Sequence, residues 1–236
     1  MKKIGIIGAM QVEIDFLVQL MADKCSKTQE GTLIFYEGKI HGKDVVVVKS
    51  GVGKVNAALC AQRLIMNYKC TNIINTGIAG ALASGLKVMD FVVSKDAVYH
   101  DMDATGFGYK KGQIPQMDVY AFNADESMVS VVKEAFNNSE LAKNYSIIEG
   151  RIATGDQFIS DKAIKNEIKT NFDPACVEME GAAIAHACHL SKIPFVIIRC
   201  MSDMADDVIT EDYNFNEPIA AELSARLVES IISYLN

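Results

Sequence analysis

The stretch KDVVVVKSGVGKVNAALCAQRLIMNYKCTNIINTG, residues 43–77, decides the fold. It begins with a β-branched apolar run, continues with a segment of helical periodicity at residues 55–68, and ends with a second apolar run at residues 71–77. A strand, a helix and a strand in this order are typical of a parallel sheet. Strands that consist almost entirely of valine and isoleucine are buried on both faces, so we expect helices to cover both sides of the sheet.

The same alternation continues along the chain in both directions. Strands are predicted at residues 2–9, 32–40, 43–51, 71–77, 90–99, 145–154 and 194–200. Helices are predicted at residues 12–21, 55–68, 126–136 and 162–172, after residue 180, and from about residue 216. No linker or repeat interrupts the pattern. Residues 1–236 are therefore interpreted as one α/β domain, with a central, mostly parallel mixed sheet flanked by helices on both faces.

Composition limits the class of ligand and the compartment. The net charge of −7 disfavours a nucleic-acid binder, which normally carries a basic surface, and is compatible with a small, weakly charged ligand. The six cysteines are widely spaced and form no C-x-x-C motif, which is the pattern of reduced thiols. No apolar run reaches the length of a membrane helix, and the first apolar run is too short for a signal peptide. We expect a cytoplasmic protein with no membrane or nucleic-acid partner.

Three familiar motifs are tested and rejected. GIIGAM at residues 5–10 lacks the G-x-G-x-x-G spacing of a dinucleotide site. In SGVGKVN, valines occupy the first glycine position and the Ser/Thr position of a P-loop. His186 and His189 stand three residues apart on a helix without an H-E-x-x-H motif, so a polar helix face is preferred to a metal site. The sequence predicts no metal and no cofactor.

Acidic residues follow three of the predicted strands. Glu13 follows the first, Glu178 and Glu180 follow a later one, and Asp203 follows the run PFVIIRC. Each alone is explained by helix capping, but the three together favour a ligand site, because ligands of open α/β sheets bind beyond strand ends. Arg199 lies at the end of the apolar strand that Asp203 follows, where burial penalises a cation unless it pairs with one of these acids.

Seven motifs then fall in the order of a known family. They are IGIIGAMQVEI, KSGVGKVNAAL, IINTGIAGAL, YHDMDATGFGY, TGDQFI, VEMEGAAIAH and RCMSDMAD, and they span nearly the whole chain. The sequence resembles the 5′-methylthioadenosine/S-adenosylhomocysteine nucleosidases of the nucleoside phosphorylase superfamily. The resemblance implies hydrolysis of the N-glycosidic bond of methylthioadenosine and S-adenosylhomocysteine, and of 5′-deoxyadenosine, with release of adenine.

The resemblance also implies a role for each site residue. Glu13 is expected to activate water, Asp203 to protonate adenine N7, and Glu180 to hold the ribose hydroxyls. The other residues expected to bind substrate are Met179 at the sugar, Phe158 and the backbone of Ile159 at the purine, Arg199 near the water, Gly80, and Met10, Val52 and Tyr213 at the 5′-alkylthio group. A homodimer is expected, in which Ala104, Phe107 and Tyr109 of the 100–118 loop complete the partner's site.

Glu178 and Glu180 are expected to differ in role. In an extended segment they would point to one side and Met179 to the other, so we expect the strand to break there if Met179 and Glu180 are both to reach the sugar. Glu178 is then the structural carboxylate. Ile78 departs from the family pattern, which often has serine at that position, so the water depends more on Glu13 and Arg199.

Three alternatives remain beside nucleoside hydrolysis at this site. A purine nucleoside phosphorylase needs a cationic phosphate site, and the chain has only four arginines, of which Arg199 alone is expected in the site. A futalosine hydrolase shares much of the framework. A non-enzymatic nucleoside-binding module has no need of both Glu13 and Asp203. Two acids that divide proton transfer and water activation are the arrangement that glycoside hydrolysis requires.

Overall fold

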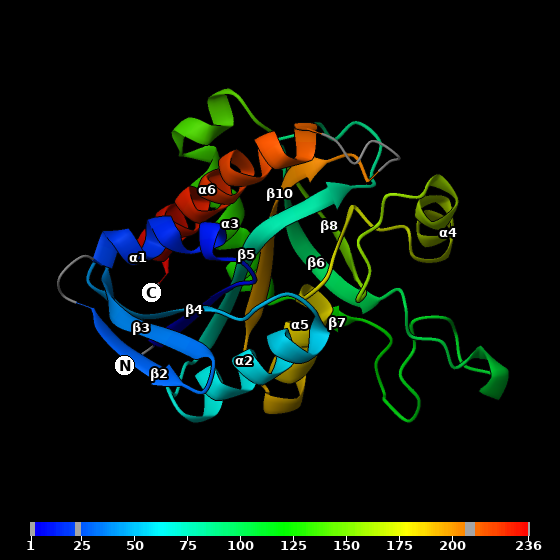
Figure 1. Cartoon of the computed structure of the whole chain (residues 1–236), viewed down its shortest axis with the longest axis horizontal. Helices are drawn as coiled ribbons and strands as arrows, with labels where there is room; N and C mark the ends of the chain where they lie inside the picture. Colours follow the sequence, from blue (N-terminus) through cyan, green and yellow to red (C-terminus); the bar gives the residue numbers. More distant parts are fainter. Residues whose placement is uncertain (1–2, 22–24, 206–210, 236) are drawn as a thin grey trace.

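A ten-stranded sheet forms the centre of the computed structural model, which describes residues 3–21, 25–205 and 211–235, with the side chains of 211–215 excepted (Figure 1). The strands are β1 (Lys3–Gly8), β2 (Ser26–Glu30), β3 (Leu33–Ile40), β4 (Lys43–Lys49), β5 (Asn72–Ala81), β6 (Phe91–Tyr99), β7 (Phe122–Asn123), β8 (Ile147–Thr154), β9 (Cys176–Glu178) and β10 (Phe195–Asp203). The helices are α1 (Asp15–Met21), α2 (Lys54–Met66), α3 (Glu126–Asn137), α4 (Lys162–Phe172), α5 (Gly181–Ser191) and α6 (Glu211–Tyr234), with 3₁₀ turns η1 (Gln11–Glu13), η3 (Thr105–Phe107) and η4 (Glu140–Lys143).

The sheet closes on itself over half of its strands. Its order is β10-β6-β8-β9-β5-β1-β4-β3-β2, and β10 also pairs with β5, so β5, β9, β8, β6 and β10 form a ring. The pairs β1–β4, β1–β5, β5–β10, β6–β8 and β8–β9 are parallel and the others are antiparallel. The predicted α/β fold with a mixed sheet is confirmed. Its closure was not predicted, because strand periodicity carries no information about which strands pair.

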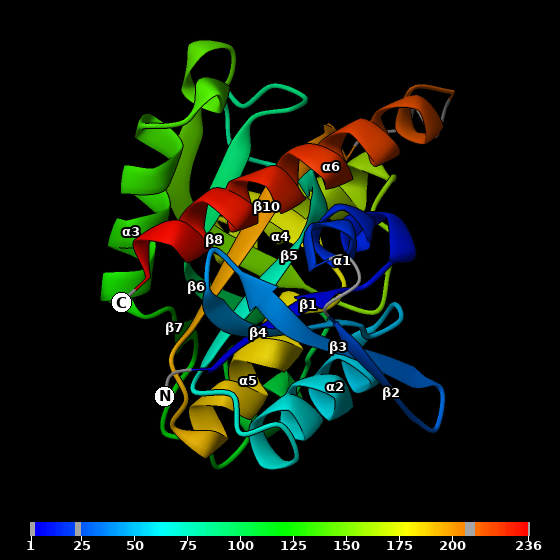
Figure 2. The ribbon, with the colours of Figure 1, turned by 90° about the vertical axis from the view of Figure 1, so that its left-hand side faces the viewer.

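Helices cover both faces of the sheet, as predicted (Figure 2). α1, α3 and α6 lie on one side, where α6 packs on β5 and β10. α2 and α5 pack against each other on the other side, over β1, β6 and β8. In the part of the chain that the structure describes, no helix combines the length and the apolar character needed to cross a membrane.

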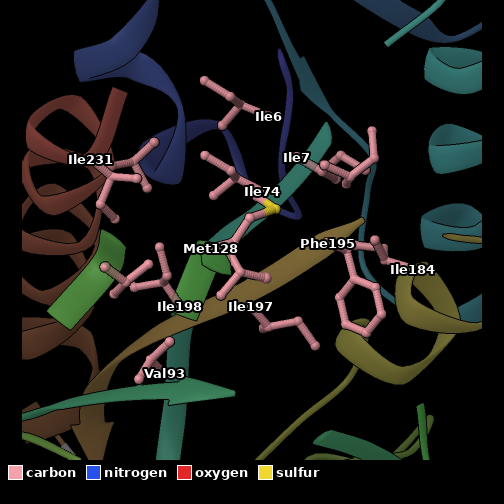
Figure 3. Packing of buried hydrophobic residues seen from close by; sticks show 14 of the residues in the cluster. Ile6, Ile7, Ile74, Val93, Met128, Ile184, Phe195, Ile197, Ile198 and Ile231 are labelled. Carbon is pink, nitrogen blue, oxygen red and sulfur yellow. The ribbon is translucent and has the colours of Figure 1, made fainter. Parts of the chain in front are cut away.

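The core explains why the strands are apolar without interruption. Successive strand residues point to opposite faces, so a sheet covered on both sides buries every position. In Figure 3, Ile198 of β10 lies on the side of Ile231 of α6, and Ile197 lies on the side of Ile184 of α5. All four side chains are buried, which fixes β10 between two helical layers and so fixes the position of the residues at its end.

Candidate functional site

A cleft with about 500 Å³ of empty space, part of it open to solvent, lies where β1, β5, β9 and β10 meet. It is lined by Ala9, Met10, Glu13, Val52, Ile78, Ala79, Gly80, Phe158, Val177, Glu178, Met179, Glu180, Ser202 and Asp203. A smaller hollow of about 260 Å³ continues past Phe158 and adds Gln157 and Ile159. Four carboxylates from three parts of the chain therefore face one space, which is the convergence that the sequence predicts.

The acids approach the cleft from two directions. β1 and β10 run parallel to β5 and deliver Glu13 and Asp203 from their carboxyl ends. β9 runs antiparallel to β5, so Glu178 and Glu180 arrive from the opposite direction. The acids thus gather beside residues 77–80 of β5. They do not all come from the carboxyl ends of parallel strands, because β9 pairs with β5 in the antiparallel direction.

Glu13 is a buried carboxylate held by backbone donors. It lies in η1, just after β1, and is 3% exposed. Its Oε2 accepts hydrogen bonds from the amides of Ala9 (2.6 Å) and Met10 (2.9 Å), and its Oε1 accepts one from the amide of Ile78 (3.1 Å). Burial raises the pKa of Glu13, while Arg199 and these three donors act in the opposite direction. A carboxylate has about four acceptor positions, so about one remains for a group in the cleft.

Arg199 lies behind the cleft and not in its lining. It is 2% exposed, its Nη2 donates to Glu178 and to Asn75 Oδ1 (2.6 Å), and its Nη1 donates to the carbonyl of Ile198 (3.0 Å). This pairing supplies the acidic partner that the burial of a strand arginine requires. Arg199 therefore acts on the cleft through its charge, and Glu13 is among the acids that raise its pKa.

Glu178 ties the arginine to the start of α5. Its Oε2 accepts hydrogen bonds from the amides of Glu180 (3.0 Å) and Gly181 (2.7 Å), and Thr154 Oγ1 donates to its Oε1. An acceptor at the first turn of a helix satisfies amides that have no partner within the helix, and its charge is favourable there. These contacts are those of a structural carboxylate.

Glu180 is held differently, by one backbone donor. β9 ends at Glu178, and Met179 and Glu180 both line the cleft, as a broken strand requires. Glu180 Oε1 accepts a hydrogen bond from the amide of Gly53 (2.8 Å), and the residue is 6% exposed. Burial and the charge of Glu178 raise the pKa of Glu180. The side chain keeps acceptor capacity for donors in the cleft.

Asp203 ends β10 at a break in its register with β5. Its Oδ1 accepts a hydrogen bond from the amide of Ala205 (2.7 Å), and Ser202 Oγ donates to its Oδ2 (2.7 Å). A Cβ at Gly80 would lie 2.8 Å from Cβ of Ala205 and 3.0 Å from Asp203 Oδ1. Glycine at position 80 therefore makes room for the acid.

Glycines of β5 make room for both acids. A Cβ at Gly77 would lie 2.5 Å from Glu13 Oε1, just as a Cβ at Gly80 would lie 3.0 Å from Asp203 Oδ1. Glu13 and Asp203 both line the cleft, so two carboxylates from separate strand ends face the same space.

The remaining predicted residues divide between the cleft and its surroundings. Met10, Val52, Gly80, Phe158 and Met179 line the cleft, and Ile159 lines the hollow beside it. Ala104, Phe107 and Tyr109 do not line this chain's cleft: their loop projects from the body at the lower right of Figure 1. The side chain of Tyr213 lies outside the described residues.

Several polar residues of the site were not predicted. Asn75 and Thr154 hold Arg199 and Glu178, and Ser202 donates to Asp203. Lys54, Asp101 and Asp156 form a network at the rim of the cleft. Their only signal in the sequence is position, since all six lie within or close to the end of an apolar strand or a glycine-rich segment. His186, by contrast, stacks on Phe122 (ring centroids 4.7 Å apart), which accounts for its half-buried position on α5.

Comparison with known proteins places this geometry in a family. Residues 3–233 match the family model described as the phosphorylase superfamily. A 5′-methylthioadenosine/S-adenosylhomocysteine nucleosidase of Staphylococcus haemolyticus is 43% identical over 98% of this chain and 100% of its own length. A crystal structure of such a nucleosidase from Colwellia psychrerythraea 34H, in complex with adenine, is also similar. Its sequence is 39% identical to this chain, the match covers 99% of this chain and 96% of that one, and the two structures superpose with a TM-score of 0.94. A futalosine hydrolase of Helicobacter pylori strain 26695 is 31% identical over 99% of this chain and 98% of that one, with a TM-score of 0.93.

Proposed function

The chain belongs to the phosphorylase superfamily and, within it, to the 5′-methylthioadenosine/S-adenosylhomocysteine nucleosidases, and on this basis we propose how its cleft works. The protein hydrolyses the N-glycosidic bond of methylthioadenosine and S-adenosylhomocysteine, and of 5′-deoxyadenosine, and releases adenine. The observation that carries the proposal is that Glu13 and Asp203, from the ends of two different strands, both line one cleft.

Glu13 activates the attacking water. Three backbone amides fix its carboxylate, and its remaining acceptor position is free to take a proton from water. Burial raises its pKa, which makes it a stronger base than an exposed glutamate, and the charge of the nearby Arg199 acts in the opposite direction, in favour of the carboxylate. Positive charge that develops on the ribose ring is stabilised by the same cluster of acids.

Asp203 protonates the leaving adenine at N7, from the other end of the nucleoside. Phe158 stacks on the purine, and the backbone of Ile159 contacts the purine edge, since both line the hollow that contains Asp203. Glu180 accepts hydrogen bonds from the ribose hydroxyls and Met179 packs on the sugar. Met10 and Val52, which line the cleft with Glu13, contact the 5′-alkylthio group.

Water is favoured over phosphate as the nucleophile. No lysine or arginine lines the cleft among the residues described, and the guanidinium of Arg199 is engaged by Glu178 and Asn75. A phosphate dianion needs cationic donors, and the four carboxylates that line this cleft would repel it.

A homodimer completes the site in this proposal. Phe107 is 88% exposed, and the exposed faces of α2 and α5 carry Val55 (70%), Leu59 (57%) and Leu190 (68%). Apolar surface of this kind marks an interface. A second copy of the chain covers α2 and α5, and its Ala104, Phe107 and Tyr109 close the 5′ end of the cleft. The six unpaired cysteines support a reducing compartment, and we place the protein in the cytoplasm.

Adenine release tests the proposal against its alternatives. Purified protein is incubated separately with methylthioadenosine, S-adenosylhomocysteine, 5′-deoxyadenosine and futalosine, and the free base is quantified by chromatography. We expect adenine from the first three and no hypoxanthine from futalosine. Hypoxanthine as the main product would assign the chain to futalosine, and tight binding of all four without turnover would make it a binding module.

A further inference from the structure

Three loops meet at the rim of the cleft in a closed ionic network. They are residues 51–53, which lead into α2 at Lys54, residues 100–104 after β6, and residues 155–158 after β8. Lys54 Nζ donates to Asp101 Oδ2 (2.6 Å) and lies 3.6 Å from Asp156 Oδ2. The amide of Lys54 donates to Asp156 Oδ1 (2.8 Å), and the amide of Asp156 donates to Asp101 Oδ2 (2.9 Å). Each of the three residues thus contacts the other two.

The Lys54–Asp101 pair of this network is better shielded than an ordinary surface ion pair, whereas the Asp156 side chain is 50% exposed. The Lys54 and Asp101 side chains are 25% and 16% exposed, whereas the surface pair Lys133–Glu149 is 49% and 37% exposed. Lys54 Nζ also lies 5.5 Å from the ring centroid of the buried Tyr99. Burial tends to raise the pKa of Asp101, but the hydrogen bonds from Lys54 and the Asp156 amide outweigh it and lower the pKa. Shielded, hydrogen-bonded ion pairs hold geometry in a way that exposed pairs do not.

Backbone geometry connects this network to the ribose end of the cleft. Gly53, next to Lys54, has a φ of +97°, which few residues other than glycine adopt, and its amide donates to Glu180 Oε1 at 2.8 Å. A Cβ at Gly53 would lie 3.2 Å from Asp156 Oδ1. The direction of the Gly53 amide is therefore set from one side by Glu180 and from the other by the contacts of Lys54 with Asp156.

The same network reaches the purine end. Asp156 stands two residues before Phe158, which lines both the cleft and the smaller hollow. The amide of Asp156 donates a hydrogen bond to Asp101. Lys54 itself does not line the cleft. The contacts that connect it to the cleft are those with Asp101 and Asp156, next to the Gly53 amide and within the 155–158 loop.

We propose that Lys54 is a positioning residue, which clamps Asp101 and Asp156 together and thereby orients Glu180 toward the ribose hydroxyls. The proposal rests on the nucleosidase function given above. It predicts a specific loss: without the ammonium group, the Gly53 amide is free to move, Glu180 loses its fixed orientation, and the enzyme gains less from a ribose hydroxyl. Misplacement of a binding group by about 1 Å can cost up to about 100-fold in rate.

The test compares two substrates on the same preparation of each variant. Values of kcat/KM are measured for methylthioadenosine and for 5′-methylthio-2′-deoxyadenosine, and their ratio reports the use made of the 2′-hydroxyl. The ratio is independent of the amount of folded enzyme, so partial misfolding does not change it. The variants are Lys54→Met, Asp101→Asn, the double variant, and Lys133→Met as a control that removes a lysine from a surface ion pair.

We expect the ratio to fall about tenfold in Lys54→Met and in Asp101→Asn, because both break the same clamp. The double variant should fall no further than the more affected single variant, and Lys133→Met should match the wild type. Equal losses on both substrates in Lys54→Met would overturn the inference, as would a wild-type enzyme that is indifferent to the 2′-hydroxyl. If the wild type releases no adenine from either substrate, the nucleosidase function itself is wrong and the inference falls with it.

Discussion

Substitution of Glu178 by alanine separates structural from functional carboxylates in this cleft. The change leaves the guanidinium of Arg199, which is 2% exposed, without its acidic partner, and it removes the acceptor for the amides of Glu180 and Gly181. Removal of one partner of a buried ion pair costs about 3–5 kcal/mol. For a chain of this length each kcal/mol lowers Tm by about 2–4 °C, so Glu178→Ala should lower Tm by about 10 °C.

Glu180→Ala should give the opposite result. It removes one accepted hydrogen bond, from the Gly53 amide, and also a carboxylate whose pKa is raised by burial and by Glu178. These effects partly cancel, so the free energy of unfolding should change by less than about 1.5 kcal/mol, while kcat/KM for methylthioadenosine should fall by about 100-fold. Thermal unfolding followed by circular dichroism, together with adenine release, measures both quantities. The reasoning fails if Glu180→Ala is the more destabilising variant, or if Glu178→Ala keeps the wild-type Tm.

Three further predictions concern the reacting groups and the assembly. Glu13→Gln and Asp203→Asn should each lower kcat by at least about 100-fold while still binding methylthioadenosine in calorimetry, because each removes a proton-transfer group without changing shape; a retained rate excludes that residue from its role. In the proposed homodimer the Phe107 ring covers the alkylthio group of the partner's ligand, so Phe107→Ala should raise KM for methylthioadenosine more than for adenosine. Equal effects on both substrates, or a fully active monomer in sedimentation, would contradict the shared site. Folding raises the pKa of Glu180 from 4.5 to about 8, so the folded state binds this proton more tightly than the unfolded state, and the group destabilises the fold increasingly as pH rises from 4.5 to about 8. Glu180→Gln should therefore be more stable than the wild type at pH 8 but not at pH 4. Parallel pH profiles of Tm for the two proteins would refute this.

Local sequence predicted the elements well where one periodicity dominates. The unbroken Val/Ile runs of β4 and β10 and the helix α4 were found at their expected positions. β2, with the sequence Ser-Lys-Thr-Gln-Glu, has no apolar alternation and is a strand only because β3 pairs with it. β7 consists of two residues and is defined by its pairing with β6. Such strands, like the pairing of β10 with β5, depend on tertiary contacts that periodicity does not encode.

The site was predictable where chemistry made a residue conspicuous. Carboxylates at the ends of apolar strands pointed to Glu13, Glu178, Glu180 and Asp203, and all four line the cleft. Arg199 was expected in the site as well, but it lies behind the lining, where it pairs with Glu178. The different roles of Glu178 and Glu180 came from the family resemblance and stay a prediction. The contacts among Lys54, Asp101 and Asp156 could not be predicted from the sequence. A lysine after a glycine-rich turn and two aspartates in loops are common, and only the folded chain brings them together.

The most direct test of the central claim is whether water or phosphate attacks the nucleoside. Methylthioadenosine is turned over by the wild-type protein in phosphate-free buffer and in buffer with saturating phosphate, adenine is quantified, and the sugar product is identified by ³¹P NMR. The carboxylate-lined cleft predicts the same rate of adenine release in both buffers and a sugar without phosphorus. Adenine release that requires phosphate, with a sugar 1-phosphate as the product, would contradict the account.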